Sequence, residues 1–194
     1  MLLLTFDDAV RFELSTVLII NLNDDQLIQA SLPVRNGGLG IRSAQMLALS
    51  AFLASAASTR ELQESILPHN IRLLEDKSVT ENETGWLAMS EASKPVAELQ
   101  HIQKAWDGLI VSNLVTKVLS RASSEVDKAR LLAASTPHSG DWLLAPPISA
   151  VGLTLSDEAI RVSVVQRLGC RAYEPHTCLC GKTATAASAP RSNE

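Results

Sequence analysis

The sequence has few of the features that mark membrane, secreted or freely nucleic-acid-binding proteins. A membrane-spanning helix needs roughly 20 apolar residues, and the apolar start of this chain gives way at once to Asp7 and Asp8, so we expect no signal peptide and no membrane partner. The three cysteines all lie in the last quarter, and an odd number does not make a disulfide framework. The formal net charge of -4 gives no general attraction for phosphates. These absences predict an intracellular protein in a reducing compartment, with nucleus and cytoplasm both open.

Aromatic residues are also scarce, at 4%, although hydrophobic residues reach 46% of the 194 positions. The apolar content is therefore mainly Leu, Ala, Val and Ile, which suits helix packing better than a sandwich of strands. Near the start, Phe6, Val10, Leu14 and Val17 recur at helical spacing, which predicts one helix face turned toward a core. Further helices are predicted after Asn23, Ser43, Thr59, either Ser123 or Ser124, and Ser156, all of which are residues that cap helices. The predicted fold class is mostly α, an irregular helical domain.

Two stretches break the helical pattern and predict short non-helical turns, around 32–41 and 138–155. The first contains Asn36-Gly37, and the second contains Pro146-Pro147 and Gly152, all of which favour turns. Between them, 75–83 is polar or charged except for Val79, which predicts an exposed link. The predicted organisation is a first helical subdomain over 5–74, the link over 75–83, a second helical subdomain over 84–169, a Cys/His segment over 170–181 and a disordered tail over 182–194.

No complete catalytic motif stands out. Arg35-Asn36-Gly37-Gly38-Leu39-Gly40 has the glycines of a phosphate loop but not its Gly-Lys-Ser/Thr ending, so a turn is the preferred interpretation. Asp24-Asp25 resembles the metal-binding pair of polymerases only superficially, because it follows a capping residue and predicts helix-terminal charge. Trp86, Trp106 and Trp142 have the spacing of core residues. We therefore expect no enzymatic activity from this chain alone.

His176, Cys178 and Cys180 form the one cluster of soft metal ligands. An imidazole and two thiolates would fill three corners of a zinc tetrahedron, and Cys170 lies close enough in sequence to be considered as the fourth. The residues after Cys180 hold no further Cys or His. The set is incomplete, and free thiols are the favoured interpretation, so no cofactor is expected.

A family resemblance rests on the order of many short pieces rather than on one diagnostic motif. The pieces run through Asn23-Asp24-Asp25-Gln26, Ala30-Ser31-Leu32-Pro33-Val34-Arg35, Gly37-Gly38-Leu39-Gly40-Ile41-Arg42-Ser43-Ala44, Leu49-Ser50-Ala51-Phe52-Leu53-Ala54-Ser55, Ala105-Trp106-Asp107, Ala129-Arg130-Leu131-Leu132-Ala133, Pro137-His138-Ser139-Gly140-Asp141-Trp142-Leu143, Pro147-Ile148-Ser149, Asp157-Glu158-Ala159, Leu168-Gly169 and Glu174-Pro175-His176-Thr177-Cys178 to Cys180-Gly181. In this order they resemble the reverse-transcriptase polyprotein of animal non-LTR (LINE-like) retrotransposons, in the region that follows the polymerase palm.

The resemblance implies a non-catalytic part of an RNA-directed DNA polymerase. The family's aromatic-Ala-Asp-Asp turn lies upstream of the matching region, and this sequence does not contain it. The region after the palm forms a thumb that helps to hold the template-primer duplex, an RNA/DNA partner met within the full-length polyprotein. Thumb helices grip a duplex through its phosphates, and Arg35, Arg42 and Arg11 are the candidate contacts.

Three other interpretations stay open. The three arginines can equally be ordinary solvated charges, given the negative net charge. The chain can also be a helical protein-interaction module that docks a partner through its apolar helix faces and has no nucleic-acid role. A truncated metal-dependent enzyme built on His176, Cys178 and Cys180 is the weakest alternative.

Overall fold

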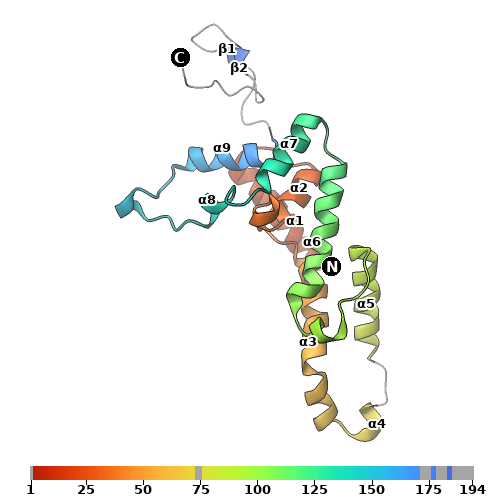
Figure 1. Ribbon diagram of the computed structural model, residues 1–194. Helices are drawn as coiled ribbons and strands as arrows, with labels where there is room; N and C mark the ends of the chain where they lie inside the picture. The colour runs from red at the N-terminus through yellow and green to blue at the C-terminus, as the bar shows by residue number, and fades with distance from the viewer. Residues whose placement is uncertain (1, 73–75, 171–175, 178–182, 185–194) are drawn as a thin grey trace. The chain divides into compact units, whose positions relative to one another are not determined.

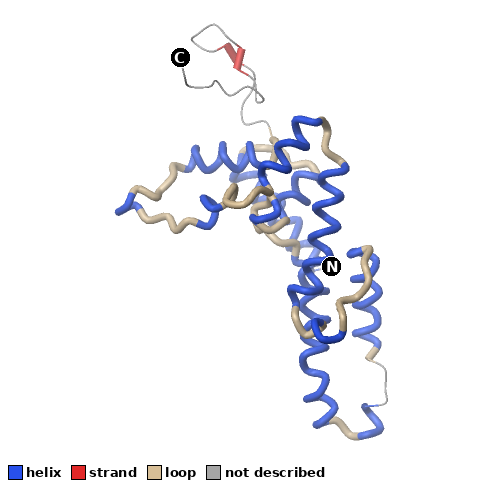
Figure 2. Tube along the Cα trace, in the orientation of Figure 1, coloured by secondary structure: helices blue, strands red, loops and turns tan. Residues whose placement is uncertain are grey.

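The computed structural model describes residues 2–72, 76–170, 176–177 and 183–184, and this part of the chain is mostly helical, as predicted (Figures 1 and 2). Its α-helices are α1 (Leu2–Leu18), α2 (Asp24–Ser31), α3 (Ala44–Ile66), α4 (His69–Arg72), α5 (Lys77–Ser90), α6 (Gln103–Ser120), α7 (Glu125–Ala134), α8 (Asp141–Leu144) and α9 (Asp157–Arg167). Short 3-10 turns are η1 (Val34–Asn36), η2 (Ala97–Leu99) and η3 (Ser149–Val151), and β1 (His176–Thr177) pairs antiparallel with β2 (Thr183–Ala184). None of the helices described is long and apolar enough to span a bilayer.

The chain divides into two compact units, each built from two separate stretches of sequence. Unit 1 comprises Met1–Asp7 and Arg42–Ser120, and unit 2 comprises Asp8–Ile41 and Arg121–Glu194. This division differs from the predicted subdomains over 5–74 and 84–169. Hydrophobic periodicity identifies individual helices, but it carries no information about which distant helix each one packs against.

Unit 1 is organised around α3, α5 and α6, which pack together in pairs. Its centre holds Trp86 of α5 and Trp106 of α6, which are 0% and 1% exposed and meet edge to face with ring centroids 4.9 Å apart. The Trp106 Nε1 donates to the Gln100 carbonyl oxygen at 2.7 Å. These two tryptophans are core residues, as predicted.

The start of α3 is fixed by two side chains. Ser43 caps the helix, as predicted, and its Oγ donates to Asp7 Oδ2 at 2.7 Å, while Asp7 Oδ1 accepts from the Ala44 N–H at 2.7 Å. Partial burial acts to raise the pKa of Asp7, but these hydrogen bonds outweigh it and hold the pKa below its usual value. A carboxylate at a helix N-terminus is also favoured by the helix dipole.

Two helix predictions in unit 1 are wrong. The expected link over 75–83 is instead the start of α5, which begins at Lys77 after the cap Asp76 and is anchored by the buried Trp86. Packing of that one large side chain outweighs the weak helix propensity of the polar residues before it. Thr59, expected to open a new helix, lies inside α3, where its Oγ1 donates to the Ser55 carbonyl oxygen at 2.9 Å.

Unit 2 has its core where α1, α2 and α9 supply apolar side chains. The buried members are Leu18, Leu22, Ala30, Val164, Val165 and Leu168, with Leu14 and Trp142 among the partly buried residues around them. The predicted inward face of α1 is only partly correct, because Phe6 and Val17 are 57% and 69% exposed whereas Leu14 and Leu18 point into this core. The face of α1 that packs against this core is therefore narrower than the apolar stripe in its sequence.

The caps predicted in unit 2 are confirmed. Asn23 forms a capping box with Gln26, Ser124 and Ser156 cap α7 and α9, and Gly169 follows α9 at φ +69°. The predicted non-helical stretches are corrected in detail, since 32–41 contains η1 and 138–155 contains α8 and η3. These are single turns of helix, too short for apolar periodicity to reveal.

Candidate nucleic-acid interface

The turn that carries Arg35 is held by one buried guanidinium. Arg167, at the end of α9, is 8% exposed. Its Nε donates to the Gly38 carbonyl oxygen at 3.1 Å, and its Nη2 donates to the carbonyl oxygens of Val34 at 2.8 Å and Ala134 at 3.0 Å. Its Nη1 donates to the Ser139 carbonyl oxygen at 3.1 Å. Burial lowers the pKa of Arg167, but a guanidinium stays charged at any ordinary pH, so these bonds are charge-assisted.

A second set of side chains ties the same turn to α7. Gln29 is buried, and its Nε2 donates to the carbonyl oxygens of Gly37 at 3.0 Å and Arg167 at 2.9 Å. Its Oε1 accepts from Arg130 Nη1 at 3.1 Å, and the same nitrogen donates to the Arg167 carbonyl oxygen. We call Gln29, Arg130 and Arg167 the polar hub of unit 2. Every buried polar group of the hub therefore has a partner, which a buried network needs to be stable.

Asp127 completes the hub at its exposed side. Arg130 donates to Asp127 Oδ1 from Nη2 at 2.7 Å and from Nε at 3.0 Å. Partial burial acts to raise the pKa of Asp127, but the hydrogen bonds from Arg130 and Ser123 hold it below its usual value. The carboxylate therefore stays ionised and orients the Arg130 guanidinium toward Gln29.

Two glycines allow the turn to approach this hub. A Cβ on Gly38 would lie 2.0 Å from the Leu32 carbonyl oxygen, so no other residue fits there without moving the backbone. Gly37 adopts φ +86°, a left-handed conformation that glycine reaches without strain. The prediction of a tight turn at Asn36-Gly37 is confirmed, and its reason is the close packing against α2.

The three predicted arginines have different surroundings. Arg35 lies exposed on η1, where its Nε donates to Asn36 Oδ1 at 3.4 Å. Arg11 is 3.2 Å from Asp24 and also donates to the Leu22 carbonyl oxygen at 3.3 Å. Both belong to unit 2, whereas Arg42 belongs to unit 1 and forms a bidentate, partly buried pair with Asp107. Of the three, Arg35 is the one without an ion pair among the residues described.

The predicted metal cluster lies mostly outside the described residues. Cys178 and Cys180 are not described, and of His176 only the backbone in β1 is. Cys170 is partly buried, and burial raises the pKa of its thiol to about 11 although Arg130 opposes the shift. Zinc displaces the proton of a cysteine when it binds, and the raised pKa of Cys170 makes that displacement more costly. The described stretches contain no group of three or more His, Cys, Asp or Glu side chains placed to hold a metal.

The Asp24-Asp25 pair and His138 have structural roles. Asp24 and Asp25 lie in the first turn of α2, as predicted, and pair with Arg11 and Arg121 at 3.2 Å and 3.0 Å. His138 lies exposed beside Asp141, with Nδ1 to Oδ2 at 2.8 Å. These groups have ordinary surface surroundings.

Sequence reasoning missed the polar hub. Arg167 and Gln29 occupy ordinary helix positions. Most of their partners are backbone carbonyls, three of them more than a hundred residues away, and a carbonyl leaves no mark on the side-chain pattern. In comparisons with known proteins, no family model, no curated protein and no solved structure matches the chain.

Proposed function

We propose that the chain is the helical, non-catalytic region that follows the palm in a non-LTR retrotransposon reverse-transcriptase polyprotein. In that setting it helps to hold the template-primer duplex. The observation that carries the proposal is that separate pieces of the resemblance meet at the polar hub. Arg167 donates to carbonyl oxygens in three of them: the piece ending at Arg35, the piece Gly37–Ala44 and the piece Pro137–Leu143.

A second meeting of pieces supports the same proposal. The Leu168-Gly169 piece packs against Arg130 of the Ala129–Ala133 piece, where a Cβ on Gly169 would lie 2.6 Å from Arg130 Nε. Short matching pieces that are scattered along a sequence by chance have no reason to be joined by one buried network. Pieces that belong to one inherited fold are expected to be joined in this way.

The proposed contact with the duplex is Arg35. Its side chain lies exposed on η1, and the hub fixes the turn beneath it, so the guanidinium has a stable platform from which to reach a phosphate. Arg11 is a weaker contact because Asp24 already neutralises it. Arg42 is withdrawn from the proposed contact set because Asp107 takes both of its terminal nitrogens.

The proposal is tested by fluorescence anisotropy with an RNA-DNA hybrid of about 20 base pairs, titrated at several salt concentrations between about 50 and 200 mM. The full chain should bind weakly, and log Kd should vary linearly with log salt. Arg35→Ala should reduce the slope by about 0.9, the value for one lost phosphate contact. Arg60→Ala is the matched control, since Arg60 is an exposed arginine of unit 1 paired with Glu64.

An unchanged slope for Arg35→Ala would refute the assigned contact. No binding by the unaltered chain at the lowest salt would refute the nucleic-acid role. That second result would favour the other candidate function, docking of a protein through apolar helix faces, which is supported by the exposure of Phe6, Phe12 and Val17 on α1.

A further inference from the structure

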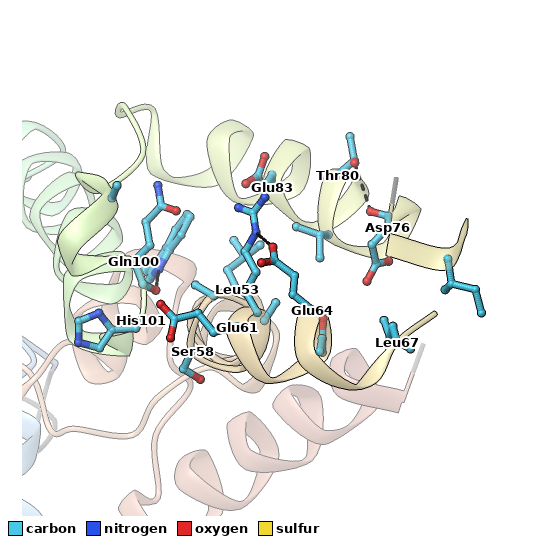
Figure 3. A pocket seen from close by; sticks show the side chains of 18 residues that line it. Leu53, Ser58, Glu61, Glu64, Leu67, Asp76, Thr80, Glu83, Gln100 and His101 are labelled. Atoms are coloured by element: carbon cyan, nitrogen blue, oxygen red, sulfur yellow. Dashed lines mark hydrogen bonds and ion pairs between the residues drawn. The ribbon is translucent and has the colours of Figure 1, made fainter. Parts of the chain in front are cut away.

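Unit 1 contains a groove of about 950 Å³ between α3 and α5 (Figure 3). The lining residues from α3 and its C-cap include a series at three- or four-residue steps, which marks the middle of one helix face. The series is Leu53, Ala57, Arg60, Glu64 and Leu67. The opposite wall runs from Asp76, the cap of α5, to Glu83. The groove lies where the side chains of α3 and α5 leave part of the space between the two helices unfilled.

The side chains explain why this seam is open over part of its length. At the closed end the buried Leu53, Trp86 and Trp106 fill the space between the helices. Further along, the facing residues are small or charged, among them Ala56, Ala57, Glu64 and Thr80, and they cannot close the gap with apolar volume. The stripe from Leu53 to Leu67 corresponds to about 21 Å of helix.

The charges lining the groove are mostly negative. Its four carboxylates are Glu61, Glu64, Asp76 and Glu83, and its basic residue is Arg60. Arg60 pairs with Glu64 at 3.3 Å, and Lys94 pairs with Glu83 at 2.7 Å. Asp76 caps α5, and Glu61 takes part in none of the ion pairs found among the described residues. Glu61 and Asp76, on opposite walls, are therefore the two carboxylates of the groove without an ion pair in the described part of the chain.

The surroundings have the same sign. Met1–Asp7 and Arg42–Ser120 together contain ten acidic and seven basic residues. A phosphate backbone would be repelled from this groove, whereas ammonium and guanidinium groups would be attracted.

We propose that the groove binds one α-helical segment of a partner protein, about 14 residues long, with a narrow stripe of Ala or Leu flanked by Lys or Arg. The stripe would lie over Ala57, Leu67 and Val79, which offer small or apolar contact. The cations would lie beside Glu61 on one wall and Asp76 on the other. A third helix along the seam of two others is a recurrent packing arrangement, and grooves of this kind are read by i, i+3, i+4 and i+7 side chains.

This inference is independent of the nucleic-acid role proposed for unit 2. The probe is a fluorescein-labelled helical peptide of about 15 residues, built from Ala, Leu and Lys with Lys flanking the apolar stripe. A second peptide has Glu in place of every Lys. The full chain should bind the Lys peptide at least about tenfold more tightly than the Glu peptide at low salt, and added salt should reduce the difference.

Three variants test whether the Lys peptide binds in the groove. Glu61→Gln combined with Asp76→Asn should weaken the Lys peptide by about tenfold, since each partly exposed pair contributes up to about fivefold. Asn keeps the cap of α5, so the helix is retained. Glu81→Gln is the matched control, because Glu81 is an exposed residue of α5 that does not line the groove. Ala57→Phe fills the groove without changing its charge and should abolish binding.

Three outcomes would overturn the proposal. One is equal affinity for the Lys and Glu peptides, and another is an equal effect of the groove variants and Glu81→Gln. The third is evidence for a different occupant of the groove. Either an RNA-DNA hybrid displaces the peptide, or the chain forms a dimer that dissociates when Glu61→Gln and Asp76→Asn are combined. Circular dichroism of each variant separates loss of the groove from loss of the fold.

Discussion

Replacing Arg167 by Met should destabilise unit 2 by about 3–5 kcal/mol. The variant keeps most of the side-chain volume but removes the Arg167 donor from four carbonyl oxygens, those of Val34, Gly38, Ala134 and Ser139. The Val34 and Ala134 oxygens keep a second donor, from the Gly37 N–H and the Ser139 hydroxyl. Each hydrogen bond to a charged group contributes about 1.5–3 kcal/mol, giving a gross loss of about 6–12 kcal/mol. Removing a buried charge returns several kcal/mol of desolvation, which leaves the stated net loss.

Arg167→Lys should lie between the variant and the original chain. An ammonium has three donors on one atom and cannot span the carbonyls that the planar guanidinium reaches. Arg161→Met is the control on the same helix, because Arg161 pairs at 3.5 Å with the exposed Glu158 and should contribute less than about 1 kcal/mol.

Two measurements test this prediction: the urea concentration at the unfolding midpoint, and the hydrogen-exchange rates of individual backbone amides. Exchange should accelerate at Leu39, Gly40 and Ile41, whose amides donate to carbonyl oxygens of α2 and its end, while amides of α6 in unit 1 keep their protection. An Arg167→Met chain with the same urea midpoint and the same exchange at these amides would show that the hub does not stabilise the turn.

Three further predictions concern single residues. Gly38→Ala should lower the free energy of unfolding by about 3 kcal/mol or more, because the new Cβ would meet the Leu32 carbonyl oxygen. Gly108→Ala, where a Cβ would have no atom within 4 Å, should instead stabilise α6 by about 0.5–1 kcal/mol. Thermal melts compare the two variants, and equal effects would contradict the close approach at Gly38. The pKa of Asp7 is lowered on folding, so its contribution to the stability of the folded state should be complete above the ordinary value of 3.8 and be lost as the pH falls further. In an acid titration of stability, Asp7→Asn should lack that loss. The same titration profile for the variant and the original chain would contradict the stabilising role of Asp7. Cys170, with a pKa of about 11, should react with iodoacetamide at pH 8 far more slowly in the folded chain than in urea, as mass spectrometry of its peptide can show; equal rates would contradict its burial.

Local signals in the sequence predicted local structure well. Asn23, Ser124 and Ser156 cap helices because a side-chain oxygen can reach an N–H two or three residues ahead, which requires no knowledge of the rest of the chain. The helix α5 was missed because its stability comes from Trp86, buried against helices that are distant in sequence. Its first residues alone favour an exposed link.

The candidate site was predicted less completely than the fold. Arg35 is exposed as a phosphate contact requires, but the sequence did not reveal that Asp107 occupies Arg42. The polar hub escaped prediction for the same physical reason, since its acceptors are backbone carbonyls that every residue has. An arginine that binds carbonyls looks in sequence like an arginine that faces water.

The sequence separations within the polar hub have a consequence for how the chain folds as it is synthesised. Gln29 donates to the carbonyl oxygen of a residue 138 positions later, and the Val34 carbonyl oxygen accepts from a residue 133 positions later. Until α9 has left the ribosome, the Val34 and Gly38 carbonyl oxygens lack the Arg167 guanidinium, and α2 has no α9 side chains to cover its apolar residues. Contacts of such long range slow folding, because a long loop must close before they form. All of unit 1 has been synthesised once Ser120 is added, so it can fold first, whereas unit 2 cannot form its core until α9 has been synthesised.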